Sequence, residues 1–186
     1  MSVNALNVVK LVAVTHFAVS TLGIVRSAYA TPPNPPYQCS ISQSNEKIRI
    51  LVSRLYSGKL DFTSETTLTE KITFEDPIAL CVGRKEVHEC FRALHDLTSP
   101  CHVIEPTLMG EYNDNSSTQI LNFYLHQRYF GCLEVVSVVD VEVGVSDGKV
   151  KRIEERWNNI ALFKGTPAIV GRRFNGILSG ILTPLF

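Results

Sequence analysis

The chain has 186 residues, 45% of them hydrophobic, and its 18 basic residues balance its 18 acidic residues. This length and hydrophobic content are sufficient for one domain with a sizeable core. No run of like charge is long enough to form a nucleic-acid-binding surface, so we expect no nucleic-acid partner. The five cysteines have neither CxxC nor Cys/His ligand spacing, which argues against a structural zinc site and leaves room for one disulfide if the chain is exported.

Residues 1–30 differ in composition from the rest of the chain. Lys10 precedes a mostly apolar run from Leu11 to Val25, and small residues follow at Ala28 and Ala30. This order is typical of a secretory signal peptide that is cleaved after Ala30. An organellar presequence, a soluble extension and a marginal membrane anchor remain alternatives. We therefore expect a secreted or membrane-associated protein, with an organelle as the second possibility.

The next segments are a linker and two expected helices. Residues 31–43 are rich in proline, which fixes φ and lacks an amide donor, so they predict an extended linker. Over residues 44–56 the apolar side chains recur at the spacing of one helix face, with Ser44 as the N-cap. The Thr-rich residues 62–70 predict a weak second helix that only packing could hold.

A strand that ends in a carboxylate comes next. Residues 72–76 predict a strand, and Pro77 prevents its continuation as a central strand because it has no amide donor. Residues 84–97 then predict a third helix with one apolar face, and Pro100 marks its exit.

From Cys101 onward the hydrophobic period approaches two, which predicts strands. We expect four of them, at residues 102–112, 118–130, 133–145 and 149–157, with turns at 113–115 and 146–148. Helices followed by an antiparallel meander predict an α+β fold in which the helices pack on one face of a curved sheet.

The C-terminal tail, residues 161–186, predicts an amphipathic helix. Its apolar side chains recur at helical spacing, and they are Phe174, Ile177, Leu178, Ile181 and Leu182. The helix is too short to span a bilayer. Three roles remain open: packing on its own domain, a homodimer contact, or a peripheral membrane contact through residues 172–186 with Arg172 and Arg173 at the headgroups.

Several short motifs resemble a known family. They are Tyr-Ser-Gly-Lys-Leu-Asp at residues 56–61, Phe-Glu-Asp-Pro at 74–77, Gly83-Arg84 and Gly-Lys-Val at 148–150. With the order of elements, they resemble the SnoaL-like, ketosteroid-isomerase-like branch of the nuclear-transport-factor-two-like superfamily, over a domain placed at residues 44–160. The resemblance implies a cone-shaped, strongly bent antiparallel sheet wrapped on three N-terminal helices. Such domains host isomerases, dehydratases, cyclases and purely binding proteins, so the fold alone does not decide the function.

The resemblance also implies a pair of carboxylates. In ketosteroid isomerases one carboxylate moves a proton between carbons, while a hydroxyl and a protonated carboxylic acid hold the enolate oxygen. By position in the motifs, the base corresponds to Asp76 and the acid to Asp140. The tyrosine position corresponds to Leu51, and the loss of one such donor typically reduces the rate about 100- to 1,000-fold. Tyr56 could replace it only if the helix were shifted.

Both carboxylates also have structural explanations. An Asp before Pro at the end of a strand can cap the turn or the following helix, which would account for Asp76. In the strand at 133–145, alternate valines form the more apolar face, and Asp140 belongs to the other face. Asp140 is therefore expected to point either to solvent or to a polar-lined pocket.

These observations predict a domain that binds a small apolar ligand or a partner in a cone-shaped pocket, without cofactor or metal. The expected pocket residues are Tyr56, Phe74, Phe123, His126 and Trp157. The alternative is an isomerase, dehydratase or cyclase that uses Asp76 and Asp140 for acid/base chemistry. The chain contains no Gly-x-Ser-x-Gly motif, phosphate loop or metal triad, which disfavours hydrolases, kinases and metalloenzymes.

Overall fold

The computed structural model describes residues 40–98, 102–104, 106–115, 117–129, 132–162 and 165–182, together with Thr21 and Val25. The elements are α2 (Gln43–Tyr56), β1 (Leu68–Glu75), β2 (Leu80–Val82), α3 (Arg84–Thr98), β3 (His102–Val103), β4 (Thr107–Asn115), β5 (Thr118–Tyr129), β6 (Leu133–Gly144), β7 (Val150–Trp157) and α4 (Thr166–Leu182). Apart from Thr21 and Val25, the predicted signal or anchor segment lies outside the described residues, as do residues 31–39 of the predicted linker.

Seven strands form one open, mixed sheet in the order β2-β1-β7-β6-β5-β3, with β4 also paired to β5. The run from β4 to β7 is the predicted antiparallel meander. However, β1 lies parallel to β7, so the expectation of a wholly antiparallel sheet was wrong. Hydrophobic alternation predicts which face a residue occupies, but it does not encode the direction of the neighbouring strand. The cone shape remains a prediction.

The helix predicted at residues 62–70 is not formed. Residues 62–64 make a turn, and β1 begins at Leu68. The Thr-rich sequence has poor helix propensity, while Leu68, Ile72 and Phe74 are buried positions that fit a strand. Two helices, not three, therefore precede the meander within the described part of the chain.

Three smaller boundaries also differ from the predictions. Helix α2 is capped by Ser42 rather than Ser44, because the Asn45 amide donates to Ser42 Oγ at 3.2 Å. The predicted strand at 102–112 divides into β3 and β4, which both pair with β5. Strand β4 also continues through the turn predicted at 113–115, and the short strand β2 was not predicted.

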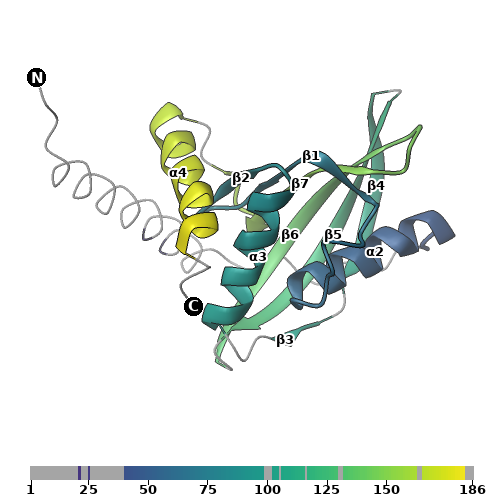
Figure 1. Cartoon of the computed structure of the whole chain (residues 1–186). Helices are drawn as coiled ribbons and strands as arrows, with labels where there is room; N and C mark the ends of the chain where they lie inside the picture. Colours follow the sequence, from purple (N-terminus) through teal and green to yellow (C-terminus); the bar gives the residue numbers. More distant parts are fainter. Residues whose placement is uncertain are drawn as a thin grey trace, which may run out of the picture.

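Helices α2 and α3 cover one face of the sheet, which we call the inner face (Figure 1). Along β5 the buried positions alternate, so Leu121, Phe123 and Leu125 point inward. The Phe91 ring of α3 lies 4.6 Å from the Phe74 ring of β1, and 5.0 Å from the Tyr56 ring of α2. The opposite side of the sheet is the outer face.

Helix α4 packs on its own domain, against α3 and β2. Among the side chains of α4 that the structure describes, Gly171, Arg172, Asn175 and Gly176 are buried, while Phe174 and Leu178 of the predicted apolar repeat are half-buried. By contrast, Ile169, Val170 and Ile177 are 38%, 59% and 40% exposed. The helix therefore uses small and polar side chains to contact the domain, and the predicted membrane and dimer contacts remain predictions.

Both arginines of α4 are engaged inside the domain. Arg172 Nη1 lies 2.6 Å from Glu75 Oε1, and Arg173 Nη1 lies 2.6 Å from Glu86 Oε2. Within the described ranges, no helix has the length and apolar character needed to cross a membrane.

Candidate functional site

Two carboxylates, Asp76 just after β1 and Glu155 within β7, belong to neighbouring strands and interact electrostatically. Strands β1 and β7 are parallel, and Glu75 pairs with Glu154. Since side chains alternate along a strand, Glu155 turns toward the inner face that Phe74 and Ile153 occupy. Asp76 directly follows the last residue of β1, and its carboxyl interacts electrostatically with Glu155 and Tyr56. Glu155 is 2% exposed.

The Glu155 carboxylate accepts hydrogen bonds from four side chains. Tyr56 Oη donates to Oε2 at 3.0 Å. Oε1 accepts from Gln127 Nε2 at 2.9 Å, from Trp157 Nε1 at 3.1 Å and from the Ser137 hydroxyl. Tyr129 extends this network by donating to Gln127 Oε1. We call the set the Glu155 cluster, which consists of Tyr56, Gln127, Tyr129, Ser137, Glu155 and Trp157.

Asp76 is bonded differently at its two oxygens. Oδ1 accepts the amides of Ile78 and Ala79, and the Asp76 amide donates to the Ala79 carbonyl at 2.9 Å. Asp76 thus closes the 76–79 turn, which is the structural role predicted for it. Oδ2 accepts no hydrogen bond from any residue that the structure describes, so only one of the two oxygens is used by the turn.

The environment favours protonated carboxyl groups. Burial, followed by the neighbouring Glu155 charge, raises the pKa of Asp76 to about 7, although two backbone amides and Arg172 oppose the rise. Burial also raises the pKa of Glu155 against its four hydrogen bonds. The pKa of Tyr56 is raised by burial and then by Glu155. Adjacent carboxyls of this kind titrate as a coupled pair, so we expect them to retain a proton where isolated carboxyls have lost it.

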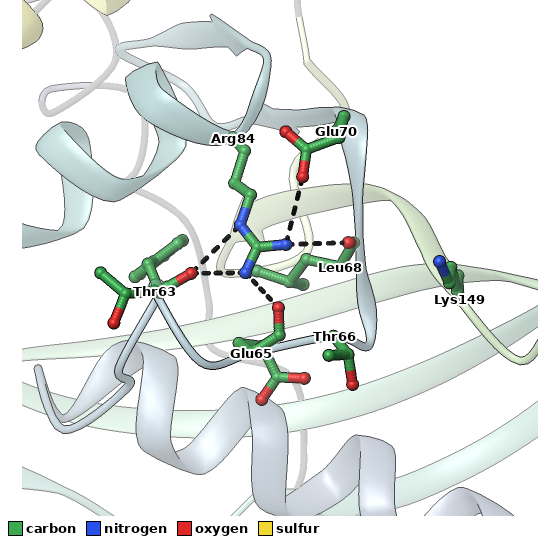
Figure 2. Close-up of a pocket in the computed structure, with 8 residues that line it drawn as sticks. Thr63, Glu65, Thr66, Leu68, Glu70, Arg84 and Lys149 are labelled. Atoms are coloured by element: carbon green, nitrogen blue, oxygen red, sulfur yellow. Dashed lines mark hydrogen bonds and ion pairs between the residues drawn. The ribbon is translucent and has the colours of Figure 1, made fainter.

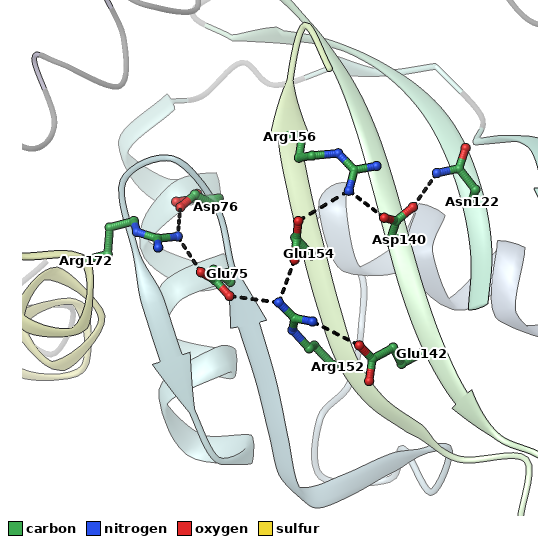
Figure 3. A network of polar contacts seen from close by, with 9 residues as sticks. All are labelled: Glu75, Asp76, Asn122, Asp140, Glu142, Arg152, Glu154, Arg156 and Arg172. Atoms are coloured by element: carbon green, nitrogen blue, oxygen red, sulfur yellow. Dashed lines mark hydrogen bonds and ion pairs between the residues drawn. The ribbon is translucent and has the colours of Figure 1, made fainter. Parts of the chain in front are cut away.

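Asp140 belongs to a different network, on the outer face (Figure 3). Its Oδ2 lies 2.6 Å from Arg156 Nη1, and its Oδ1 accepts from Asn122. From there an ion-pair chain runs through Glu154, Arg152 and Glu75 to Arg172. The sheet therefore separates the Asp140 carboxylate from Glu155 on the inner face.

The predicted pocket residues fall into three groups. Tyr56 and Trp157 belong to the Glu155 cluster. Phe74 and Phe123, which are 2% and 0% exposed, lie in the hydrophobic core. His126 alternates to the outer face, where its Nε2 lies 3.3 Å from Glu134.

Sequence reasoning missed Gln127, Tyr129, Ser137 and Glu155. A signal for the three that are not aromatic was present, because each interrupts an apolar face at an inward position. Gln127 continues the phase of Phe123 and Leu125, and Glu155 continues the phase of Ile153. A polar residue at such a position must find buried partners, which marks it as a candidate for a site.

A separate cavity of about 500 Å³ lies beside the loop before β1 (Figure 2). Its lining consists of Phe62, Thr63, Glu65, Thr66, Leu68, Glu70, Arg84 and Lys149. The Arg84 guanidinium donates to the backbone carbonyls of Phe62, Glu65 and Leu68, and it lies 3.5 Å from Glu70. Arg84 therefore fastens this loop. In the ranges described above, no three His, Cys, Asp or Glu side chains gather as metal ligands.

Neither a protein-family model nor a curated protein matches the chain. Similar solved structures include a protein from Shewanella putrefaciens assigned as a SnoaL-like polyketide cyclase, with 10% identity, a TM-score of 0.46 and coverage of 64% of this chain and 82% of that one. A second is an NTF2-like protein from Anabaena variabilis, with 19% identity, a TM-score of 0.42 and coverage of 64% of this chain and 93% of that one. A third is a hypothetical protein from Catenulispora acidiphila with a ketosteroid-isomerase-like fold. Its identity is 10%, its TM-score is 0.46, and the match covers 73% of this chain and 98% of that one.

These neighbours are of the SnoaL-like, NTF2-like and ketosteroid-isomerase-like kind that the sequence motifs suggested. The identities are 10–19% and the TM-scores lie below 0.5, so we base no argument on these likenesses.

Proposed function

We propose that this protein binds a small, uncharged molecule on the inner face of its sheet, through Asp76 and the Glu155 cluster. The ligand would have an apolar body and a ketone or hydroxyl oxygen. The observation that carries the proposal is the convergence of two carboxyl groups and a tyrosine: Glu155 and Tyr56 are buried, and Asp76 beside them is half-buried.

The energetic argument is that a hydrophobic core does not need these groups. Carboxyls are rarely buried, because removing them from water disfavours their charged form. Each unit by which the pKa of Asp76 or Glu155 is raised corresponds to about 1.4 kcal/mol of penalty for the ionised form. Titratable groups with such shifts concentrate at functional sites. We therefore assign the cluster to recognition rather than to packing.

The chemistry of the cluster sets the class of ligand. With a pKa of about 7, Asp76 is present in both protonation states near neutral pH, so it can donate a proton to a carbonyl or accept one from a hydroxyl. The surrounding Phe74 and Phe91 rings suit an apolar body. An anionic ligand would meet the Glu155 charge and is disfavoured.

A second candidate function is proton transfer, as in an isomerase, dehydratase or cyclase. The observation that favours it is again the pKa of Asp76, because a general base works best when its pKa lies near the working pH. In this form of the proposal Tyr56 and Glu155 polarise the substrate oxygen, and Asp140 takes no part because it pairs with Arg156 on the outer face.

A binding experiment with matched ligands tests the proposal. Ring ketones, the corresponding alcohols and hydrocarbons of equal size would be titrated into the protein and followed by NMR. We expect the oxygen-bearing members to bind at least about tenfold more tightly, since one buried hydrogen bond contributes about 1.5 kcal/mol. The D76N and E155Q variants should reduce that preference. If the bound ketone exchanges its α-protons with D₂O, the D76N variant should stop the exchange.

The D140N variant is the matched control, because it removes a carboxylate of the same sheet from the opposite face. We expect it to retain the ligand preference. Equal loss in D76N and D140N, or no discrimination between ketone and hydrocarbon by the wild type, would exclude the inner-face site.

A further inference from the structure

Helix α4 lies along the open edge of the sheet at β2. Asn175 Nδ2 donates to the Ile78 carbonyl at 2.8 Å, and Arg173 Nη1 approaches the Leu80 carbonyl at 3.3 Å. A Cβ on Gly176 would lie only 2.2 Å from the Leu80 oxygen, so helix and strand backbones are in close contact. An exposed edge strand presents such carbonyls to solvent or to other chains, and here a helix covers them.

Two residues of α4, Arg172 and Asn175, contact the turn that carries Asp76. Arg172 is 2% exposed, and its Nη1 lies 2.6 Å from Glu75 Oε1 and 3.3 Å from the Asp76 carbonyl oxygen. Asn175 is 5% exposed and binds Ile78, the middle of the turn. Figure 3 shows Arg172 reaching from α4 to both Glu75 and Asp76. Residues from the far end of the chain therefore hold the backbone on either side of the Asp76 side chain.

We propose that Arg172 and Asn175 are positioning residues of the site. From α4 they hold the 76–79 turn, and thereby keep the Asp76 carboxylate beside Glu155. The inference rests on the proposed function, because it gives the C-terminal helix a part in the ligand site. It also implies that docking of α4 and occupancy of the site are coupled, each favouring the other.

The titratable and charged groups that act on Asp76 come from three elements. Glu155 lies on β7, Tyr56 on α2, and Arg172 reaches it from α4, whereas the neighbouring Glu75 pairs with Arg152 and Arg172. Burial is the largest cause of the raised pKa of Asp76. A looser turn would admit water to the carboxyl, so its titration would move down toward the ordinary range.

The test follows the amides of Ile78 and Ala79 by NMR during a pH titration without ligand, since both donate to Asp76 Oδ1. In N175A we expect these amides to exchange with solvent about tenfold faster, as for the loss of one hydrogen bond. The Asp76 midpoint should move down by roughly half a pH unit or more. R172K should also move the Asp76 midpoint down. Because lysine keeps the positive charge, this shift would result from the looser turn and not from the loss of a cation.

R173M is the matched control, because Arg173 belongs to the same helix but contacts Leu80 and Glu86, beyond the turn. It should leave the Asp76 midpoint unchanged even if it lowers the melting temperature. An unchanged midpoint in both N175A and R172K, or an equal shift in R173M, would overturn the inference and reduce α4 to a stabilising cover. Ligand binding is not measured in this test, so its failure is distinguishable from failure of the proposed function.

Discussion

Glu155 gives the interior of this sheet its chemical character. It takes an inward position on β7, yet all four of its described hydrogen-bond partners are side chains rather than backbone groups. A buried polar network of this kind stabilises the fold only when each of its polar groups has a hydrogen-bond partner. Asp76 adds a second carboxyl to the same environment, and the two raised pKa values follow from this shared burial.

The raised pKa values predict how stability depends on pH. In the unfolded chain Asp76 loses its proton near pH 4, whereas in the folded protein it keeps the proton to about pH 7. Between these values the folded state binds more protons, so the free energy of unfolding falls as pH rises. In D76N this part of the slope disappears, while the amide oxygen can still accept from Ile78 and Ala79. At pH 8 we expect the free energy of unfolding of D76N, measured by urea denaturation, to be higher than that of the wild type by about 1 kcal/mol or more.

The corresponding control is D140N, which removes the partner of Arg156 from the outer face. It should lower stability at neutral pH while retaining the wild-type slope between pH 4 and pH 7. A D76N protein that shows the full wild-type slope, or that is less stable than the wild type at pH 8, would mean that Asp76 serves only to close its turn.

At the scale of elements, α4 places small and polar residues against the domain in the part of the helix whose side chains the structure describes. Gly171, Arg172, Asn175 and Gly176 are buried, while Ile169, Val170 and Ile177 are exposed. The polar contacts have a physical reason, since the edge of β2 presents backbone carbonyls that need donors, and only polar side chains can supply them.

Gly176 provides a stability test of this packing. On helix propensity alone, alanine in place of an interior glycine should stabilise a helix by about 0.5–1 kcal/mol. Here the added Cβ would lie 2.2 Å from the Leu80 oxygen, so helix or strand must move. We expect G176A to destabilise the protein by about 1–3 kcal/mol in thermal or urea unfolding.

The comparison for this variant is G110A, since a Cβ on Gly110 of β4 would meet no atom within 4 Å. It should change the melting temperature little. If G176A proves to be as stable as the wild type or more stable, α4 does not make the close contact with β2 that we describe.

At the scale of the molecule, the order of elements was largely predictable. Helices α2 and α3 and strands β5 to β7 follow from hydrophobic period and turn residues, which are local signals. The direction of β1 relative to β7 was not predictable, and neither was the covering of β2 by α4, because both depend on contacts between segments far apart in the chain.

The site was predictable in part. Asp76 was named from the family motifs, whereas Tyr56 and Trp157 were named as expected pocket residues; the strand alternation around Val139 and Val141 separated Asp140 from the core. Glu155 was missed, because its role arises from the parallel register that puts Glu154 opposite Glu75. Without that register, nothing in the sequence places Glu155 beside Asp76.

The coupling of Asp76 to Glu155 is the central claim, and a carboxyl ¹³C NMR titration tests it most directly. In the wild type we expect Asp76 to titrate near pH 7, far above an ordinary aspartate. In E155Q the neighbouring charge is gone, so the pKa of Asp76 should fall clearly below the wild-type value. An Asp76 carboxyl that titrates near pH 4 in the wild type, or whose midpoint is the same in E155Q, would contradict the account.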